Sequence, residues 1–256
     1  WVPETNKYNK RLQTLLNKRL KQSNPNKEIL SKDYSKLFEN RILTCQNTKE
    51  EEKAITKVLN EKYFKDRDKN LPAITIDDLM NMTGAPSGSK FRLKENVKFE
   101  STKEDKRGLS ISITHPLMSD YSRFLYVDKN TKETVMYNDY FIPDKSNKYL
   151  PKGIGTMALY CQAKELQKYG INRIDCLAVG DYRVIKYWSG YYVWPAIGFN
   201  SEIPNYFIDI LNSKVNSPKL LKSIKDAKDM VDIMNVKELK VYWKKYGSSI
   251  ICTFDV

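Results

Sequence analysis

The stretch Tyr149-Leu150-Pro151-Lys152-Gly153-Ile154-Gly155-Thr156 decides the fold, because it lies between a strand-like segment and a long apolar-periodic helix. The strand-like segment covers residues 134–142, and the helix is predicted over residues 154–169 with Gly170 directly after it. A glycine-rich turn of this kind exposes backbone N–H groups, and the helix N-terminus adds a partial positive charge. The stretch therefore predicts a cradle for a phosphate group. The alternative is a tight turn with no ligand.

Helical periodicity dominates the sequence upstream of residue 88. Leucines at helical spacing predict a helix over residues 12–20, and shorter patterns predict helices over residues 28–38 and 50–64. The apolar face of the last of these is expected to consist of Ala54, Val58, Leu59 and Tyr63. Thr75 and Asp78 have the spacing of a capping box, which predicts a fourth helix that begins there. Residues 84–88, Gly-Ala-Pro-Ser-Gly, are expected to end it.

The pattern then changes from helical to strand-like. Alternating and β-branched segments predict strands over residues 91–99, 108–114, 121–127 and 133–142, and later over residues 171–179 and 249–254. Residues 128–131 have the composition of a hairpin turn. The fold class expected is α+β, with a mixed, mostly antiparallel central sheet flanked by helices and an N-terminal helical region.

Two domains are expected, a basic helical region at residues 1–86 and a second domain at residues 87–256. Residues 201–247 exceed a minimal connection between the last two strands, so we expect a helical insertion there. Its helices are predicted near residues 206–211, over residues 219–234 and before Gly247. We expect such an insertion to form either one wall of a cleft for a substrate or a docking surface.

The charge is strongly positive and unevenly distributed. The chain of 256 residues carries a net charge of +13, and residues 1–50 hold 11 Lys and Arg against 5 Asp and Glu. Residues 1–50 are therefore a candidate surface for nucleic acid or another acidic partner, the alternative being a solvated lysine-rich face. Apolar runs are too short for a membrane span, so we expect no membrane partner and a cytoplasmic location.

The cysteine and histidine content limits the possible chemistry. Cys45, Cys161, Cys176 and Cys252 are scattered among apolar residues and are predicted to be reduced core thiols. The single histidine, His115, is expected in a loop. With one histidine and no paired cysteines, we expect neither a metal site nor a Ser-His-Asp triad.

Residues 150–155, Leu-Pro-Lys-Gly-Ile-Gly, resemble the acyl-CoA-binding signature of the GNAT superfamily of N-acetyltransferases. Strands precede the signature, a helix and a strand follow it, and a Gly198-Phe199 pair ends a later aromatic segment, in the order found in that superfamily. The resemblance covers roughly residues 90–256. The chain departs from the pattern at Leu150, where Arg or Gln is usual, and at Pro151, which has no N–H group.

The resemblance implies an acyl-CoA-dependent N-acyltransferase that moves acetyl from acetyl-CoA to an amine by direct attack. The backbone of Tyr140, Phe141 and Ile142 would then face pantetheine. The pyrophosphate would be held by the amides of Lys152, Gly153, Ile154, Gly155 and Thr156, with added charge from Lys152 and a hydroxyl from Thr156.

Catalysis in this family needs a base for the amine and an acid for the leaving thiolate. Asp139, on the strand before the cradle, is the first candidate for the base, and Asp181 is the second. The usual acid is a tyrosine at the position of Trp194, so Tyr191 and Tyr192 are the candidates, with Tyr187 as a further option. The alternative for each tyrosine is aromatic packing.

Two other functions remain open at this point. One is a catalytically inactive GNAT-like module whose basic helical arm serves assembly or nucleic-acid attachment. The other is an active enzyme whose basic arm recruits an acidic substrate such as tRNA. The sequence does not identify the amine that accepts the acyl group.

Overall fold

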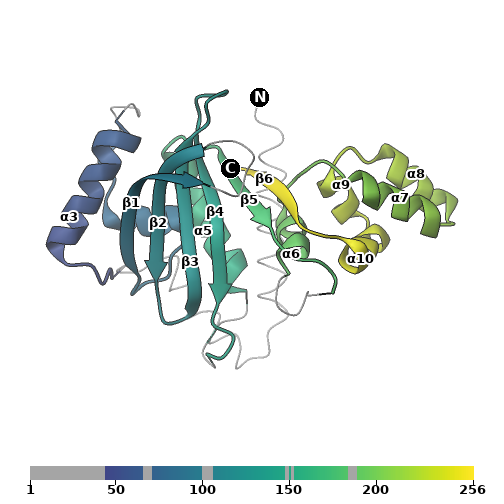
Figure 1. Cartoon of the computed structure of the whole chain (residues 1–256), viewed down its shortest axis with the longest axis horizontal. Coiled ribbons are helices and arrows are strands. Elements are labelled where there is room, and N and C mark those ends of the chain that lie inside the picture. Colours follow the sequence, from purple (N-terminus) through teal and green to yellow (C-terminus); the bar gives the residue numbers. More distant parts are fainter. Residues whose placement is uncertain (1–43, 66–70, 100–105, 148–149, 151–152, 184–188) are drawn as a thin grey trace. The chain divides into compact units, whose positions relative to one another are not determined.

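The computed structural model describes residues 44–65, 71–99, 106–147, 150, 153–183 and 189–256. The fold is α+β, with six strands in an open, mostly antiparallel sheet flanked by helices (Figure 1). The predicted fold class is confirmed at this level. The predicted helices at residues 12–20 and 28–38 lie outside the described residues, as do Tyr149, Pro151, Lys152 and Tyr187.

The described residues fall into two compact units, and each is considered by itself. The first contains the described residues from 44 to 174 together with Val256, and the second contains those from 175 to 255. Helices on both sides of residue 86 belong to the first unit. The predicted division into domains at residues 1–86 and 87–256 stays a prediction.

Four consecutive antiparallel strands build the sheet of the first unit. They are β1 (Lys90–Phe99), β2 (Lys106–Thr114), β3 (Met118–Val127) and β4 (Thr134–Pro143). Alternation along β2 buries Leu109, Ile111 and Ile113, because successive side chains point to opposite faces of a sheet. The hairpin between β3 and β4 is stabilised by Asp128, whose carboxylate accepts from the N–H groups of Asn130 and Thr131.

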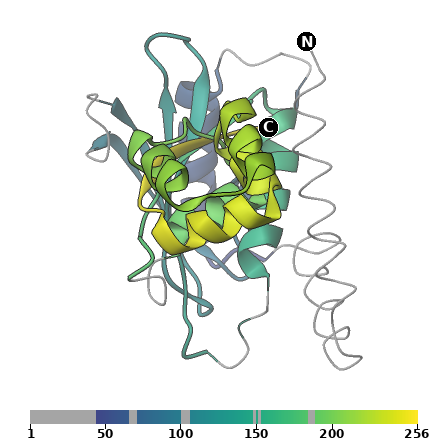
Figure 2. The ribbon, with the colours of Figure 1, turned by 90° about the vertical axis from the view of Figure 1, so that its right-hand side faces the viewer.

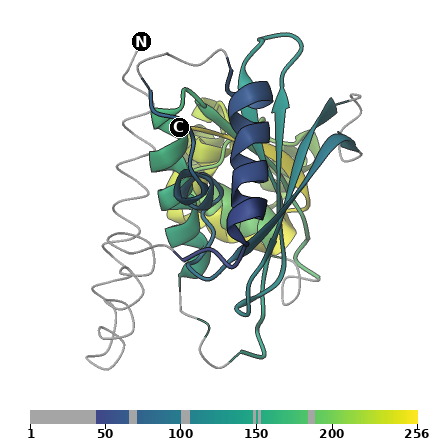
Figure 3. The same ribbon diagram turned by 90° about the vertical axis from the view of Figure 1, so that its left-hand side faces the viewer.

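Three α-helices lie on one face of these strands, as Figures 1 and 3 show. They are α3 (Lys49–Val58), α4 (Ile76–Thr83) and α5 (Ile154–Lys168), and a π-helical turn, η1 (Leu59–Tyr63), extends α3. The predicted capping box of Thr75 and Asp78 is present at the start of α4. The predicted apolar face of α3 was partly wrong: Ile55 and Leu59 are buried, whereas Ala54 is exposed. The buried residues are four apart, as one helix face requires.

Helix α5 has glycine at both ends, as the sequence predicts. Gly153 precedes it with a φ of +94°, and Gly170 follows it with a φ of +72°. At the C-terminal end, the N–H of Ile171 donates to the carbonyl of Leu166, and that of Gly170 donates to the carbonyl of Gln167. This pair of bonds is a Schellman motif, which satisfies carbonyl groups that the helix itself leaves open. The helix boundaries are therefore encoded locally.

The second unit combines the end of the chain with a cluster of short helices (Figure 2). Strand β5 (Arg173–Ala178) leads into it and β6 (Ile250–Asp255) closes it, with Thr253 of β6 donating to Asp175 of β5. The helices are α6 (Gly190–Ile197), α7 (Asn205–Lys214), α8 (Pro218–Asp226), α9 (Met230–Asn235) and α10 (Lys237–Tyr246).

Helices α7 to α10 occupy the segment in which an insertion was predicted. The predicted continuous helix over residues 219–234 is wrong, because it consists of two helices. Asp229 interrupts it: its side chain caps α9 by accepting from the N–H of Asp232, while its backbone is extended. An aspartate prefers this capping position to a helix interior, so it starts a new helix.

Trp243 of α10 is central to the core of the second unit. Its ring is fully buried and meets the ring of Phe207 edge-on at 4.8 Å between centroids. Its indole N–H donates to the carbonyl of Tyr191 at 2.8 Å. Because Leu239 and Trp243 point inward, α10 turns its remaining side chains outward. No helix among the described residues has both the length and the apolar character needed to cross a membrane.

Candidate functional site

The N-terminus of α5 retains the features that an anion site needs. Gly153 adopts a left-handed backbone that favours glycine, and its carbonyl accepts the first helical hydrogen bond, from Met157. No side chain of the described residues caps the helix, and its first turn contains no acidic residue. The N–H groups of the first turn have no acceptor within the helix, and they lie at the positive end of its dipole. This end of α5 is therefore suited to a negatively charged group.

Gly155 connects this turn to strand β4. A Cβ atom at Gly155 would lie 3.5 Å from Cε1 of Phe141, which is an ordinary van der Waals contact. The backbone of Gly155 has no positive φ, so neither backbone conformation nor packing explains a glycine there. Phe141 and Gly155 belong to separate elements, and both were predicted to line the same ligand. The fold brings these two residues together.

Strand β4 contains a β-bulge at Asp139. In the antiparallel register Tyr140 pairs with Ser122 and Asn138 pairs with Arg123, so Asp139 is one residue in excess. Bulges re-aim side chains and are common beside active sites. Here Asp139 lies on the same face as Ser122, whose hydroxyl donates to its carboxylate at 3.0 Å. Counted back from Phe141, which lies on the side of α5, strict alternation without the bulge would turn Asp139 toward the helices.

The environment of Asp139 makes its carboxylate easier to protonate than that of an ordinary aspartate. Asp139 is exposed at the surface, yet partial removal of water by the surrounding protein raises the pKa of this carboxyl above its ordinary value, and the nearby Asp120 acts in the same direction. The hydrogen bond from Ser122 and the charge of Arg123 oppose this shift without cancelling it. A carboxylate with a raised pKa is a stronger base than an ordinary aspartate, which is the property that a proton acceptor near neutral pH requires.

A buried arginine supports the bulge from behind. Arg123 is only 2% exposed, and its Nη1 donates to the carbonyl of Tyr140 at 2.9 Å and to that of Ser122 at 3.0 Å. Its Nε donates to the carbonyl of Thr83 at the C-terminal end of α4, where the helix dipole is negative. The guanidinium therefore joins α4 to the bulge through carbonyl oxygens.

A pair of buried amides fixes α5 against β4. Asn138 and Gln162 exchange two hydrogen bonds, of 3.0 and 2.9 Å, between their side-chain amide groups. Both residues are buried, so a lost bond would leave a polar group without a partner. This pair positions the helix that carries the anion-facing turn relative to the strand that carries Asp139.

The other residues predicted to bind the cofactor differ in accessibility. Tyr140 is 44% exposed, and Phe141 and Ile142 are half-buried. Ile154 and Thr156 are buried, so their backbone groups are better placed than their side chains to meet a ligand. Lys152 lies outside the described residues. The described residues of this set belong to the end of β4 and the start of α5.

The candidate acids belong to the second unit and are described within it. Tyr191 is fully buried, and its hydroxyl donates to the carbonyl of Lys244 at 2.7 Å. Burial raises the pKa of Tyr191 to about 12 and also raises that of the half-buried Tyr192. Asp181 pairs with Arg183 at 2.9 Å. Trp194 packs edge-on against Phe199.

The four cysteines and the histidine make contacts that are typical of structural residues. All four cysteines are free, and Cys161, Cys176 and Cys252 are buried, as predicted. The prediction of a core position was wrong for Cys45, which is only half-buried. His115 lies in the loop before β3, where its Nδ1 accepts from the N–H of Leu117 and its Nε2 lies 3.1 Å from the carbonyl of Ser87. In the part of the chain that the structure describes, no group of three metal-binding side chains occurs.

Sequence reasoning missed the residues that support the site. Arg123, Ser122, Asn138 and Gln162 were not predicted, although each contacts the bulge or fixes α5. The sequence contains a signal for one of them. Arg123 directly precedes the apolar run Phe124-Leu125-Tyr126 and shares a strand face with Tyr121, so a buried arginine was deducible. The bulge has no comparable signal.

The chain matches no protein family model, no curated protein and no solved structure. The geometry of the site therefore carries the functional proposal.

Proposed function

We propose that this protein is an acyl-CoA-dependent N-acyltransferase, with acetyl-CoA as the donor and an amine as the acceptor. The observation that carries the proposal is the closeness of Phe141 to Gly155, at which an added Cβ atom would lie 3.5 Å from the phenylalanine ring. It brings a helix N-terminus that has no side-chain cap among the described residues close to a strand with a bulged aspartate. The helix N-terminus can bind the anionic end of a ligand, and the aspartate can act at the reacting end of the same ligand.

The pyrophosphate of the donor would meet the backbone N–H groups of Ile154 and Gly155. An extended arm would then follow the end of β4, past Phe141 and Ile142, toward the face that bears Asp139. Since the turn and Asp139 lie on opposite faces of β4, the ligand must be long enough to pass around the strand. A pantetheine arm between pyrophosphate and thioester meets this requirement.

Asp139 would act on the acceptor amine. It would take the proton that the nitrogen loses as it attacks the thioester carbonyl, and the carbon–sulfur bond would break to release CoA. The thiolate would take up a proton from solvent or from a tyrosine. The raised pKa of Asp139 supports its role as base.

Calorimetry with acetyl-CoA tests the binding half of the proposal. Gly155→Glu places a negative charge beside the phosphate position, whereas Gly155→Gln has the same size and no charge, and Gly155→Ala adds a single methyl group at ordinary contact distance. We expect Glu to weaken the Kd at least about tenfold relative to Gln, which is ~1.4 kcal/mol. Alanine should bind like the parent chain. No binding by the intact chain would refute the proposal.

Turnover tests the catalytic half. Asp139→Asn keeps an oxygen that can accept from Ser122, so it should leave the affinity for acetyl-CoA unchanged. We expect it to lower the rate of amine acetylation by about 100-fold, the usual size of a lost general base. CoA release is measured chromatographically with a panel of primary amines. An unchanged rate in the variant would remove Asp139 from the mechanism.

A second function is favoured by one observation. The hydroxyl of Tyr191 is buried and already donates to a backbone carbonyl, so this residue is poorly placed to protonate a thiolate. An inactive GNAT-like module would bind acetyl-CoA and transfer nothing. A chain that binds acetyl-CoA, remains folded and acetylates no amine in the panel would support that function, with its basic arm serving attachment to a partner.

A further inference from the structure

The outer side of α10 combines lysine side chains with tyrosine rings. We call this the lysine–tyrosine surface and define it by Tyr182, Lys214, Tyr242, Lys244, Lys245 and Tyr246, all in the second unit. It follows from the inward position of Trp243, because a helix that buries Leu239 and Trp243 must present the following lysines outward. None of these residues belongs to the site at β4 and α5.

Tyr246 is the centre of this surface. The Nζ atoms of Lys214 and Lys245 lie 5.4 and 5.2 Å from the centroid of its ring. The ring of Tyr242 stacks on it at 6.3 Å, and Tyr182 meets it edge-on at 6.4 Å. Three aromatic rings are thus grouped beside two ammonium groups.

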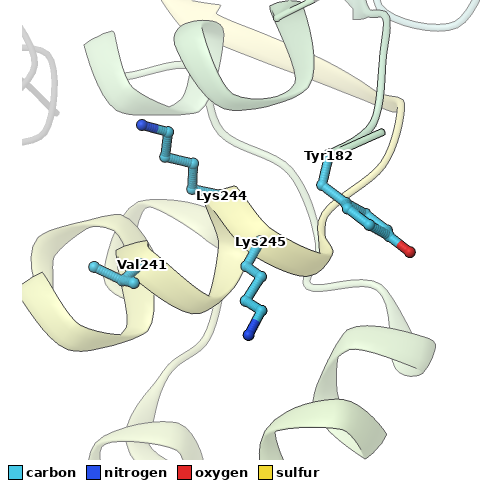
Figure 4. A pocket seen from close by; sticks show the side chains of 4 residues that line it. All are labelled: Tyr182, Val241, Lys244 and Lys245. Atoms are coloured by element: carbon cyan, nitrogen blue, oxygen red, sulfur yellow. The ribbon is translucent and has the colours of Figure 1, made fainter. Parts of the chain in front are cut away.

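Two shallow hollows lie along this surface. One has a volume of about 320 Å³ and is lined by Tyr182, Val241, Lys244 and Lys245 (Figure 4). The other has a volume of about 390 Å³ and is lined by Lys214, Val241, Tyr242, Lys245 and Tyr246. Val241 and Lys245 line both, so the hollows adjoin. Figure 4 shows that Lys244 and Lys245 leave α10 in different directions.

Three lysines of this surface have no ion pair with any carboxylate of the described residues. Among the residues that the structure describes, no carboxylate oxygen lies within 4.0 Å of the ammonium groups of Lys214, Lys244 or Lys245. Lys240 and Lys244 also share one ring, that of Tyr192, at 5.7 and 5.5 Å, although like charges four residues apart on a helix repel. The surface therefore concentrates positive charge that an anionic partner would neutralise.

We propose that the lysine–tyrosine surface binds single-stranded nucleic acid. The ammonium groups would contact successive phosphates, and unpaired bases would stack on Tyr182 and enter the adjoining hollows. Tyr182 is 49% exposed and Val241 is 61% exposed, so a planar apolar base has both a ring face and an aliphatic contact available. Basic grooves with exposed aromatic rings are the recurrent design for single strands.

The aromatic rings favour a single strand over the other anionic partners. An acidic protein segment would need the lysines but would gain little from the ring faces. A duplex hides its bases and would contact lysines alone. The proposal goes beyond the acyltransferase function and does not depend on it.

Fluorescence anisotropy with labelled oligo-dT and oligo-U of about 15 nucleotides tests the proposal on the full chain. The double variant Lys244→Glu/Lys245→Glu removes two phosphate contacts. We expect the Kd to weaken at least tenfold and the slope of log K against log salt to fall by about 1.4. The matched control Lys53→Glu/Lys57→Glu changes the net charge equally on the exposed side of α3 and should have little effect.

Variants of Tyr182 distinguish the contribution of base stacking to binding from the contribution of charge. Tyr182→Ala should weaken binding about fivefold to tenfold, whereas Tyr182→Phe keeps the ring and should bind like the parent chain. Equal losses in the α10 and α3 double variants would overturn the proposal, because they would reflect net charge alone. So would equal affinity for poly-glutamate or duplex DNA with no effect of Tyr182→Ala. Acetyl-CoA binding should be unchanged in all these variants, so the two proposals can fail separately.

Discussion

The two units place cations against aromatic rings in different ways. In the first unit, the carbon of the Arg123 guanidinium lies 4.5 Å from the ring centroid of Tyr121 and 5.6 Å from that of Phe141, while its N–H groups bind carbonyl oxygens. In the second unit, Lys244 lies over Tyr192 and Lys245 over Tyr246, and no carboxylate oxygen of the described residues lies within 4.0 Å of either ammonium group. The buried cation is committed to the fold, whereas the exposed ones keep their hydrogen-bonding capacity for a partner.

The largest effect is expected where the buried cation is removed. Arg123→Met fills similar space but leaves the carbonyls of Thr83 and Tyr140 without this donor, so we expect a loss of about 3 kcal/mol in unfolding free energy. Urea denaturation measures it. Lys245→Met on α10 is the control and should change stability by less than ~0.5 kcal/mol. If both substitutions lowered the unfolding free energy equally, the buried and the exposed cation would not differ in their contribution to stability.

The next effect concerns ion pairs in the same two units. Arg173 donates to Asp128 at 2.7 Å, and this bond, with the backbone N–H groups of the turn, lowers the pKa of Asp128 to about 2. A lowered carboxyl pKa stabilises the fold above the unfolded value and loses this contribution as pH falls toward 2. Asp128→Asn should therefore cost about 2 kcal/mol at pH 7 and almost nothing at pH 2.

An exposed ion pair in the second unit provides the comparison for the Asp128→Asn measurement. Arg183 and Asp181 are 2.9 Å apart, but the arginine side chain is 72% exposed. Asp181→Asn should change stability by less than ~0.5 kcal/mol at any pH, since exposed ion pairs contribute little. A loss as large as that of Asp128→Asn would show that exposure does not separate the two units.

Asp139 should respond to pH in the opposite direction to Asp128. Its pKa is raised, so the folded state holds its proton more tightly than the unfolded state, and stability falls as pH rises between the two pKa values. Asp139→Asn removes this penalty and should raise stability at pH 7 by about 0.5 kcal/mol, a small value for an exposed group. Chemical denaturation at pH 3 and pH 7 provides the comparison. A variant that is less stable at pH 7 would contradict the direction of the shift.

A small effect is also expected on α10. Tyr246→Leu removes the ring shared by Lys214 and Lys245 but keeps an apolar side chain, so the loss should be below ~1 kcal/mol. Thermal denaturation detects it, with Tyr246→Phe as the ring-preserving control. A larger loss would mean that the tyrosine rings of α10 are part of the core.

Local signals in the sequence predicted the elements well. The Thr75–Asp78 capping box, the hairpin turn after β3 and Gly170 at the end of α5 each depend on residues close in the chain, and each is present. Features that depend on distant partners were not predictable. The bulge at Asp139 arises from the register between β3 and β4, and the fate of the Tyr191 hydroxyl depends on Lys244, 53 residues away.

The candidate site was predictable only as two separate pieces. Gly153 and Gly155 at the start of a predicted helix favour an anion-facing turn, with a tight turn that has no ligand as the alternative. That Phe141 lies beside Gly155 requires the strand and the helix to be packed together, which no periodicity expresses. The orientation of Asp139 requires the bulge as well.

The amide pair of Asn138 and Gln162 has a consequence for how α5 is oriented. Gln162 stands seven residues after Gly155, which is close to two helical turns, so both lie on the side of the helix that faces β4. The two reciprocal hydrogen bonds therefore prevent α5 from rotating about its own axis. A chain with apolar residues at both positions could fold with equal stability and still point its first-turn N–H groups in a different direction.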